Sequence, residues 1–318
     1  NRSLGSNLGT STCDVDILKE MFRFYNMEIP PRRLVISGGG MRAVAHIGAV
    51  QVLEERGLLK GIREFVGVSA GAMFAFCLCI GYSLKEIEQI ICGFDFQFIR
   101  SITPETMMEF PTNFGIDDRE NLLRFLHSLM KQRGIDPDTT FAELKTKSSF
   151  RCYATDLCTC TFREFSKEKS PTVKLTKALQ ASMCLPAYFI PIQDPETGHM
   201  LIDGGVINNY PMSFLTKEEQ AQSIGLSFSY NHTTVDEIPD IGSFFMQIFA
   251  CYYMPRARET ETMFAERTIL VPKGDYPPWN FEASEEEKQE LIGAGKKAAL
   301  NFFRGSRQVK PLRRYSVS

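Results

Sequence analysis

Short continuous apolar runs alternate with stretches of helical periodicity along most of this 318-residue chain. The run at residues 34–37 predicts a buried strand, and apolar positions at helical spacing predict a helix over residues 43–59. A second buried strand is expected at 64–68 and a further helix at 70–80. Strands that alternate with helices in this order form parallel sheets through crossover connections. The pattern therefore predicts an α/β fold.

The same two periodicities continue toward the end of the chain. Further helices are expected at residues 83–91, 118–132, 140–143, 175–183, 244–254 and 284–303. Further strands are expected at residues 150–157, 161–165, 200–202, 223–229 and 268–271. Ser83 with Glu86, and Ser284 with Glu287, form the capping-box pattern that begins a helix. The apolar helices at 70–80 and 244–254 are expected to be buried; the alternative for 244–254 is a pocket wall or a dimer face.

Composition suggests where the folded part begins and ends. Residues 1–13 are rich in Ser, Gly and Asn and are expected to be disordered, whereas an amphipathic stretch at 16–26 precedes two prolines. We expect a single domain over residues 14–303. Residues 304–318 form a tail with five basic and no acidic residues. Such a tail would add attraction to an anionic membrane surface.

The overall charge excludes one broad class of function. The chain is 43% hydrophobic and 23% charged, with a formal net charge of -2 and a pI near 6.2. This is an ordinary soluble composition without the basic surplus of a nucleic-acid-binding protein. The longest apolar run, residues 70–82, is shorter than the roughly 20 residues of a membrane span. No secretory signal pattern appears in this sequence. A cytoplasmic protein that associates transiently with membranes or lipid surfaces is expected.

Nine cysteines are present, an odd number, and most lie in apolar runs. Free cysteine in such runs behaves as a small hydrophobic residue, which is typical of a reducing compartment. Two cysteine pairs, 77/79 and 158/160, are separated by one residue each. That spacing matches neither the redox C-x-x-C motif nor the usual zinc motifs. No metal and no cofactor are therefore expected.

Candidate chemistry first appears at Gly67-Val-Ser69-Ala-Gly71, directly after the strand at 64–68. The pattern G-x-S-x-G between a strand and a helix is typical of a nucleophile elbow, where Gly67 and Gly71 let the chain turn without a Cβ clash. By residue frequencies alone, about one chain in ten of this length would contain such a match. The neighbouring motifs must therefore decide whether Ser69 is a nucleophile.

A glycine loop, Gly38-Gly39-Gly40, connects the first strand to the first helix. Unobstructed backbone N–H groups at a helix N-terminus can bind an anion or stabilise a developing oxyanion. The phosphate loop of nucleotide-binding proteins requires a lysine that is missing, and the dinucleotide motif requires a glycine where Ala43 stands. The alternative is that the glycines only allow the helix and the strand to pack closely.

A serine nucleophile needs a base, and two kinds are available. The chain has four histidines, none of which has a context that places it beside Ser69: His46, His127, His199 and His232. Asp203-Gly204-Gly205 instead follows the apolar strand at 200–202, and strand ends in parallel sheets meet at the ligand-binding edge. The alternative for Asp203 is an ordinary Asp-Gly turn.

Three motifs in this order and spacing, GGGMR (38–42), GVSAG (67–71) and DGG (203–205), resemble the patatin-like phospholipase family. The stretches LQASMCLPAYFIPI and VINNYP are similar to the family too, so the resemblance covers residues 34–211 and is looser over 212–303. The resemblance implies a three-layer α/β domain with a central, mainly parallel sheet flanked by helices. It also implies a lipid acyl hydrolase of the phospholipase A type that works through an acyl-serine.

Carried over residue by residue, the resemblance implies that Ser69 is the nucleophile and Asp203 the general base. The backbone amides of Gly38, Gly39 and Gly40 would form the oxyanion hole. Arg42 occupies the basic position of the glycine motif, where it would steady the loop or bind a lipid phosphate; the alternative is a surface arginine at a helix start. One departure is Ala43, where the family usually has glycine. Alanine requires a negative φ there.

The implied partners are a phospholipid or other acyl-lipid substrate and, peripherally, a membrane surface, with a protein activator left open and no oligomeric state predicted. Large apolar residues gather between positions 94 and 114, where they would form a lid or an irregular cover of the core: Phe94, Phe96, Phe98, Ile99, Met107, Met108, Phe110 and Phe114.

Two alternative functions remain. One is a lipid-binding or regulatory protein on the same scaffold with little activity. The other is a histidine-assisted hydrolase that uses His232.

Overall fold

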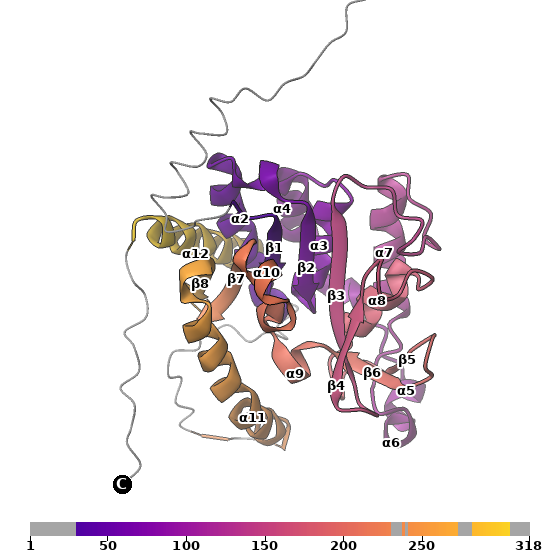
Figure 1. Cartoon of the computed structure of the whole chain (residues 1–318). Helices are drawn as coiled ribbons and strands as arrows, with labels where there is room; N and C mark the ends of the chain where they lie inside the picture. The colour runs from indigo at the N-terminus through magenta and orange to yellow at the C-terminus, as the bar shows by residue number, and fades with distance from the viewer. Residues whose placement is uncertain (1–29, 230–236, 239–240, 273–281, 306–318) are drawn as a thin grey trace, which may run out of the picture.

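Eight strands pair into one sheet in the computed structural model, which describes residues 30–229, 237–238, 241–272 and 282–305. The strands are β1 (Arg33–Ile36), β2 (Glu64–Val68), β3 (Ser149–Asp156), β4 (Thr161–Phe165), β5 (Ile192–Gln193), β6 (Met200–Asp203), β7 (Ser223–Ser229) and β8 (Thr268–Pro272). Their order is β5-β6-β3-β2-β1-β7-β8, with β4 also paired to β3 (Figure 1). The neighbours among β1, β2, β3, β7 and β8 are parallel. The other three pairings, β3–β4, β3–β6 and β5–β6, are antiparallel.

Helices fill most of the connections between the strands. The α-helices are α2 (Ala45–Glu55), α3 (Ala70–Cys79), α4 (Leu84–Gly93), α5 (Pro104–Met108), α6 (Phe110–Asn113), α7 (Glu120–Gln132), α8 (Leu175–Ser182), α9 (Gly205–Asn208), α10 (Lys217–Ala221), α11 (Ile241–Met263) and α12 (Glu285–Phe303). Single 3-10 turns are η1 (Gly40–Val44), η2 (Leu58–Gly61), η3 (Phe96–Ile99), η4 (Pro211–Phe214) and η5 (Ala265–Arg267). Both predicted capping boxes are present, at the starts of α4 and α12. None of the described helices is long and apolar enough to cross a membrane.

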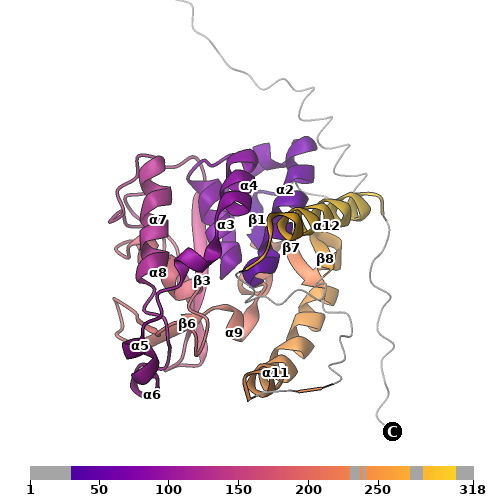
Figure 2. The ribbon, with the colours of Figure 1, turned by 180° about the vertical axis from the view of Figure 1, so that it is seen from behind.

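Side chains on alternate positions of the strands point into two separate hydrophobic clusters. Leu34 and Ile36 of β1 belong to the larger cluster, whose helices include α2, α3 and α8. Val35, between them, belongs to the smaller cluster, together with Val66 and Val68 of β2 and residues of η4. Figure 2 shows α4, α7 and α12 on the near side of the sheet, the side of the larger cluster. The sheet is therefore covered on both faces, which confirms the predicted α/β fold.

Two predicted helices differ from the structure for local reasons. The predicted helix 43–59 is divided into η1, α2 and η2. Gly57, with a left-handed φ of 71°, separates α2 from η2. The predicted short helix at 140–143 is a single turn. Thr140 pairs with Lys174 in an isolated bridge, and the Glu143 carboxylate accepts the Thr140 N–H at 2.9 Å. The chain then extends into β3 instead of continuing the helix.

The predicted burial of residues 244–254 is wrong, although the helix exists. Phe244, Ile248 and Tyr252 of α11 are 46%, 52% and 54% exposed. They are spaced four residues apart and so share one side of the helix. Cys158 and Cys160 do not behave as the small hydrophobic residues expected of cysteines in apolar runs, since both lie exposed in the β3–β4 turn. Four other cysteines in apolar runs are buried: Cys77, Cys79, Cys152 and Cys184.

Several predictions concern parts of the chain that lie outside the described residues. These are the expected disorder of residues 1–13, the amphipathic stretch at 16–26, the tail beyond residue 305 and any role of His232.

Candidate active site

Ser69 lies in the turn between β2 and α3, at the carboxyl end of β2. Its backbone has φ 55° and ψ -131°, a combination that L-residues rarely adopt. The Ser69 N–H donates to Ser182 Oγ at 3.0 Å, and its carbonyl oxygen accepts the Ala72 N–H at 2.9 Å as α3 begins. These two hydrogen bonds hold the backbone of Ser69 in its strained conformation.

Gly67 and Gly71 avoid a Cβ clash at this turn, as expected. Neither adopts a left-handed conformation, since the positive φ of this turn falls on Ser69 itself. A Cβ at Gly67 would overlap the Gly71 carbonyl oxygen, and a Cβ at Gly71 would overlap the Ser37 carbonyl oxygen. Both glycines are thus required for the close approach of α3 to the sheet.

Asp203 is the last residue of β6, and its carboxylate contacts the serine. Ser69 Oγ donates to Asp203 Oδ2 at 2.5 Å, and the Gly205 N–H donates to Oδ1 at 2.7 Å. The backbone is held as well, because the Asp203 N–H donates to the Cys184 carbonyl oxygen at 2.7 Å. Asp203 is 6% exposed. The two residues are 134 positions apart in sequence, and the fold brings them into direct contact.

The strand that carries Asp203 runs in the direction opposite to the one expected. β6 pairs antiparallel with β3, with Asp203 opposite Ala154. Asp203 therefore reaches Ser69 on a strand that enters from the carboxyl edge of the parallel strands, not at the end of one of them. The following glycine allows this approach, because a Cβ at Gly204 would overlap the Tyr153 carbonyl oxygen.

Burial determines the protonation of the Asp203 carboxyl group. Loss of solvent disfavours the charged form and raises its pKa to about 6, against the opposing effect of the hydrogen bonds from Ser69 and Gly205. Above this pKa the carboxylate can accept the Ser69 proton. A carboxylate with a pKa of about 6 is a stronger base than an exposed aspartate.

The glycine loop lies directly against Ser69. A Cβ at Gly38 would be 2.9 Å from Ser69 Cβ. The Gly38 N–H already donates to the Asn209 carbonyl oxygen at 3.0 Å, which differs from its predicted role as a free donor. Gly39 and Gly40 donate no backbone hydrogen bond within the part of the chain that the structure describes. These two amides are the remaining candidates for binding an oxyanion.

Arg42 and Ala43 both lie in η1, directly after the glycine loop. Arg42 is 8% exposed, so the alternative of a surface arginine is wrong. Ala43 is buried and has no positive φ. The turn therefore accommodates alanine without backbone strain.

The described histidines do not contact Ser69. His46 is fully buried in α2, where its Nε2 lies 3.1 Å from the Ser37 carbonyl oxygen, and burial lowers its pKa to about 4. His127 is half-buried on α7. His199 Nδ1 lies 2.8 Å from Asp156 Oδ2. Asp203 is thus the base candidate that the described chain brings to Ser69.

One group of metal-ligating side chains occurs among the described residues. Ligand atoms of Asp156, Cys158 and His199 lie within 4.8 Å of one another. The β3–β4 turn accounts for this group, because Asp156 Oδ1 accepts the backbone N–H groups of Cys158 and Thr159 at 2.8 and 3.2 Å. Its other oxygen is bonded to His199. We assign no metal to it.

Two residues of the site were not singled out from the sequence. Ser182 accepts the Ser69 N–H, and Asn209 holds Gly38 from both sides, since its Nδ2 also donates to the Gly38 carbonyl oxygen at 2.9 Å. Both belong to the stretches LQASMCLPAYFIPI and VINNYP that resemble the family. The resemblance pointed to these stretches, but it did not assign a role to either residue.

Comparison with known proteins identifies a family. The family profile described as patatin-like phospholipase matches residues 34–216. Protein YqhO of Bacillus subtilis (strain 168), whose function is uncharacterised, is 26% identical over 288 residues, 85% of this chain and 97% of that protein. The probable lipid hydrolase 463L of invertebrate iridescent virus 6 is 29% identical over 198 residues, 61% of this chain and 67% of that protein.

A similar fold occurs among solved structures. VipD from Legionella pneumophila superposes with a TM-score of 0.55 at 16% sequence identity. The match covers 87% of this chain and 67% of the VipD chain. At this identity the similarity supports the shared fold.

Proposed function

Because the chain belongs to the patatin-like phospholipase family, we propose that it hydrolyses fatty-acyl esters of phospholipids, with Ser69 as the nucleophile and Asp203 as the general base. The observation that carries this proposal is the 2.5 Å contact between Ser69 Oγ and Asp203 Oδ2 at a strained turn. A buried carboxylate that accepts a serine hydroxyl is the base that a serine nucleophile requires.

The proposed reaction has two halves. Ser69 Oγ attacks the ester carbonyl carbon while its proton passes to Asp203 Oδ2, and the amides of Gly39 and Gly40 hold the oxyanion. The carbon–oxygen bond to the leaving alcohol then breaks, and Asp203 returns the proton to that alcohol. Water next attacks the acyl-serine and passes a proton to Asp203. The bond from the acyl carbon to Ser69 Oγ breaks, Asp203 returns the proton to Ser69 Oγ, and the fatty acid is released. Arg42, buried beside this loop, is proposed to steady it.

A lipid substrate must be reached at a membrane surface, and one side of the molecule is suited to this. The short helices α5 and α6 contain no buried residue, and Met107 and Met108 are 59% and 82% exposed. α11 reaches the same end as α5, α6 and α9 in both views (Figures 1 and 2). Phe244 and Ile248, in the first turns of α11, are exposed. α9 follows directly after Asp203. We propose that this end contacts the bilayer.

The test is fatty-acid release from mixed phospholipid vesicles, together with hydrolysis of a soluble p-nitrophenyl ester. Wild type is compared with Ser69→Ala, Asp203→Asn and the matched control Ser128→Ala, an exposed serine on α7. We expect a loss of at least about a thousandfold in both site variants and none in the control, with folding checked by thermal melting. Wild-type turnover in folded Asp203→Asn would contradict the proposed base. Vesicle binding without release of fatty acid by wild type would instead favour a lipid-binding protein.

A further inference from the structure

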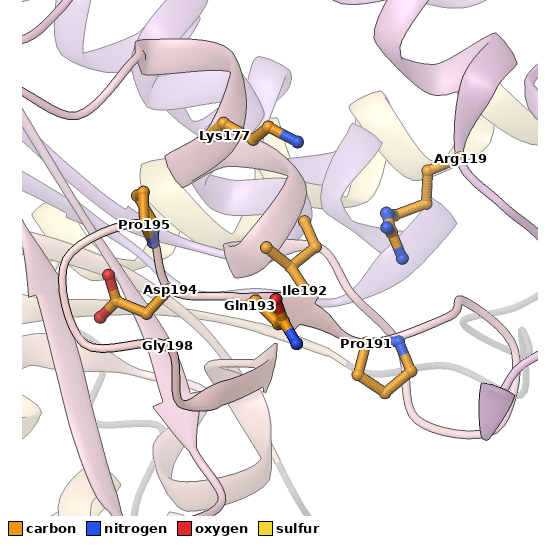
Figure 3. Close-up of a pocket in the computed structure, with 8 residues that line it drawn as sticks. All are labelled: Arg119, Lys177, Pro191, Ile192, Gln193, Asp194, Pro195 and Gly198. Carbon is orange, nitrogen blue, oxygen red and sulfur yellow. The ribbon is translucent and has the colours of Figure 1, made fainter. Parts of the chain in front are cut away.

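A cavity of about 520 Å³ lies between the start of α7, the helix α8 and the segment around β5 (Figure 3). Arg119, Lys177, Gln193 and Asp194 are the polar side chains that line it. None of the residues of the proposed active site takes part in its wall. The cavity is within the size range of small-molecule sites.

Arg119 contributes a cation that the protein does not neutralise by a hydrogen bond. Its Nε and Nη1 atoms are inaccessible to solvent and have no hydrogen-bond partner in the described chain. The neighbouring Asp117 is not hydrogen-bonded to the guanidinium, because its two oxygens accept the backbone N–H groups of Ser101 and Arg119 at 2.7 and 2.8 Å. Loss of solvent lowers the Arg119 pKa more than the nearby Cys184, Asp117 and Asp118 raise it. Buried charges are normally paired, so this guanidinium calls for an anion.

The backbone aims this side chain in a fixed direction. Arg119 precedes α7 in a left-handed conformation, with φ 68°. Such a conformation is unfavourable for arginine and persists only where its surroundings impose it. The bond from the Arg119 N–H to Asp117 does so, and Asp117 is itself anchored through backbone bonds to Tyr188 and Ile190. The strained turn thus directs the guanidinium into the cavity, as Figure 3 shows.

Lys177 supplies a second cation from the opposite wall. It is exposed on α8, and Figure 3 shows its side chain extending across the cavity toward Arg119. The carboxylate of Asp194 does not offset these charges, because it points away from Arg119 and accepts Arg163 Nε at 2.6 Å and the Glu196 N–H at 3.0 Å. Two cations therefore face one cavity, and the single carboxylate in its wall is already paired.

We propose that this cavity binds a phosphate group through Arg119 and Lys177. Nη2, the Arg119 nitrogen that is not buried, can donate to one phosphate oxygen and the flexible ammonium can bind others, which suits a doubly charged tetrahedral anion. The remaining volume accommodates the organic part of a phosphate monoester. Two sources share this chemistry, the phosphorylated headgroup of a lipid and a soluble phosphate ester.

The first experiment titrates inorganic phosphate into the full chain by calorimetry at constant ionic strength. Wild type is compared with Lys177→Gln, Arg119→Asn and Lys131→Gln, an exposed control on α7 that removes the same charge. Asparagine is chosen because it tolerates a left-handed backbone. We expect saturable binding by wild type and the control, and affinity about tenfold or more weaker in each cavity variant. Absence of saturable binding by wild type, or unchanged affinity in folded Lys177→Gln and Arg119→Asn, would overturn the proposal.

The second experiment separates the two sources and does not depend on hydrolysis. Ser69→Ala protein is mixed with phosphatidylcholine vesicles that contain or lack phosphatidylinositol 4-phosphate, and bound protein is recovered by flotation. Extra binding to the phosphorylated lipid that Lys177→Gln removes assigns a lipid headgroup. Phosphate binding in solution without extra vesicle binding assigns a soluble phosphate ester. Because the serine is absent, the result is the same whether or not the hydrolase proposal holds.

Discussion

At the residue scale, the burial of Asp203 has two consequences that different experiments can measure. Its carboxyl group is held away from water beside Ser69, and its pKa is raised to about 6. The protonated form cannot accept the serine proton, so this pKa should appear in the rate. The charged form is unfavourable in the folded protein, so the same pKa should appear in the stability.

The first prediction concerns the pH dependence of the rate. We expect kcat/KM for a soluble ester to rise with pH through about 6 and to level off above it, because the base acts in its deprotonated form. His199→Gln serves as the control, since His199 is also bonded to a carboxylate and should not alter the profile. A rate that is independent of pH across this range would argue against Asp203 as the base.

The second prediction concerns the stability of Asp203→Asn. The pKa of Asp203 is 3.8 without perturbation and about 6 in the folded protein, so its favourable contribution exists at low pH and is lost as the pH rises through about 6. Asparagine cannot ionise. We therefore expect the variant to gain about 2 kcal/mol relative to wild type between about pH 4.5 and pH 8, measured by urea unfolding. If the variant and wild type differ in unfolding free energy by the same amount at both pH values, the pKa of Asp203 is not raised.

Sequence patterns predicted the residues of the site better than they predicted what each residue does. Ser69, Asp203 and the glycines stand in short motifs, and chemistry needs these residue types at these spacings. The left-handed conformation of Ser69 and the bond between Gly38 and Asn209 follow from long-range contacts. Neither has a local signal.

At the element scale, the crossing of α2 and α12 depends on two glycines. A Cβ at Gly48 of α2 would overlap the Ile292 carbonyl oxygen, and a Cβ at Gly295 of α12 would overlap the Ala45 carbonyl oxygen. The two helices therefore touch backbone to backbone. Because α2 follows the glycine loop, this crossing also supports the proposed oxyanion site.

The third prediction compares two glycines of the same helix. Gly295→Ala should destabilise the protein by about 2 kcal/mol or more, because the methyl group must push the helices apart. Gly293→Ala, exposed and free of contacts two residues away, should be neutral or stabilise by up to about 1 kcal/mol. Urea unfolding of both variants makes the comparison. Similar effects of the two changes would mean that α12 can shift without cost.

Elements with strong local signals were predicted well, and those set by their neighbours were not. The capping box and apolar period of α4 are local, and the structure confirms them. The antiparallel direction of β6 depends on where β3 lies, and nothing in the apolar run at residues 200–202 encodes it. The exposed side of α11 likewise depends on what packs against the helix.

At the scale of the whole molecule, exposed apolar side chains collect at the end that carries α5, α6 and the start of α11. Residues 94–114 were expected to form either a lid or an irregular cover of the core, and the structure supports neither in full. Phe94 and Phe96 pack on the core, whereas Met107, Met108 and Phe114 do not. Side chains of this kind gain free energy by entering a bilayer.

The fourth prediction tests this surface. The double variant Met107→Ser with Met108→Ser should bind phosphatidylcholine vesicles about tenfold less tightly, because two large apolar side chains no longer enter the bilayer. Its hydrolysis of a soluble ester should be unchanged. Met263→Ser, an equally exposed methionine at the opposite end of α11, is the control. Equal vesicle binding by wild type and the double variant would place the membrane contact elsewhere.

The alternation of strands and helices, and the order of the GGGMR, GVSAG and DGG motifs, were sufficient to predict the fold class and the family, because both depend on residue types along the chain. The tertiary structure decides which residues far apart in sequence come into contact and which are buried. It brings Ser69 and Asp203 to 2.5 Å across 134 positions, and it removes Asp203 from water. It also leaves the Arg119 guanidinium without a hydrogen-bonded anion in the described chain. Contacts between distant segments, burial and solvation are properties of the packed chain, which is why no local pattern predicts them.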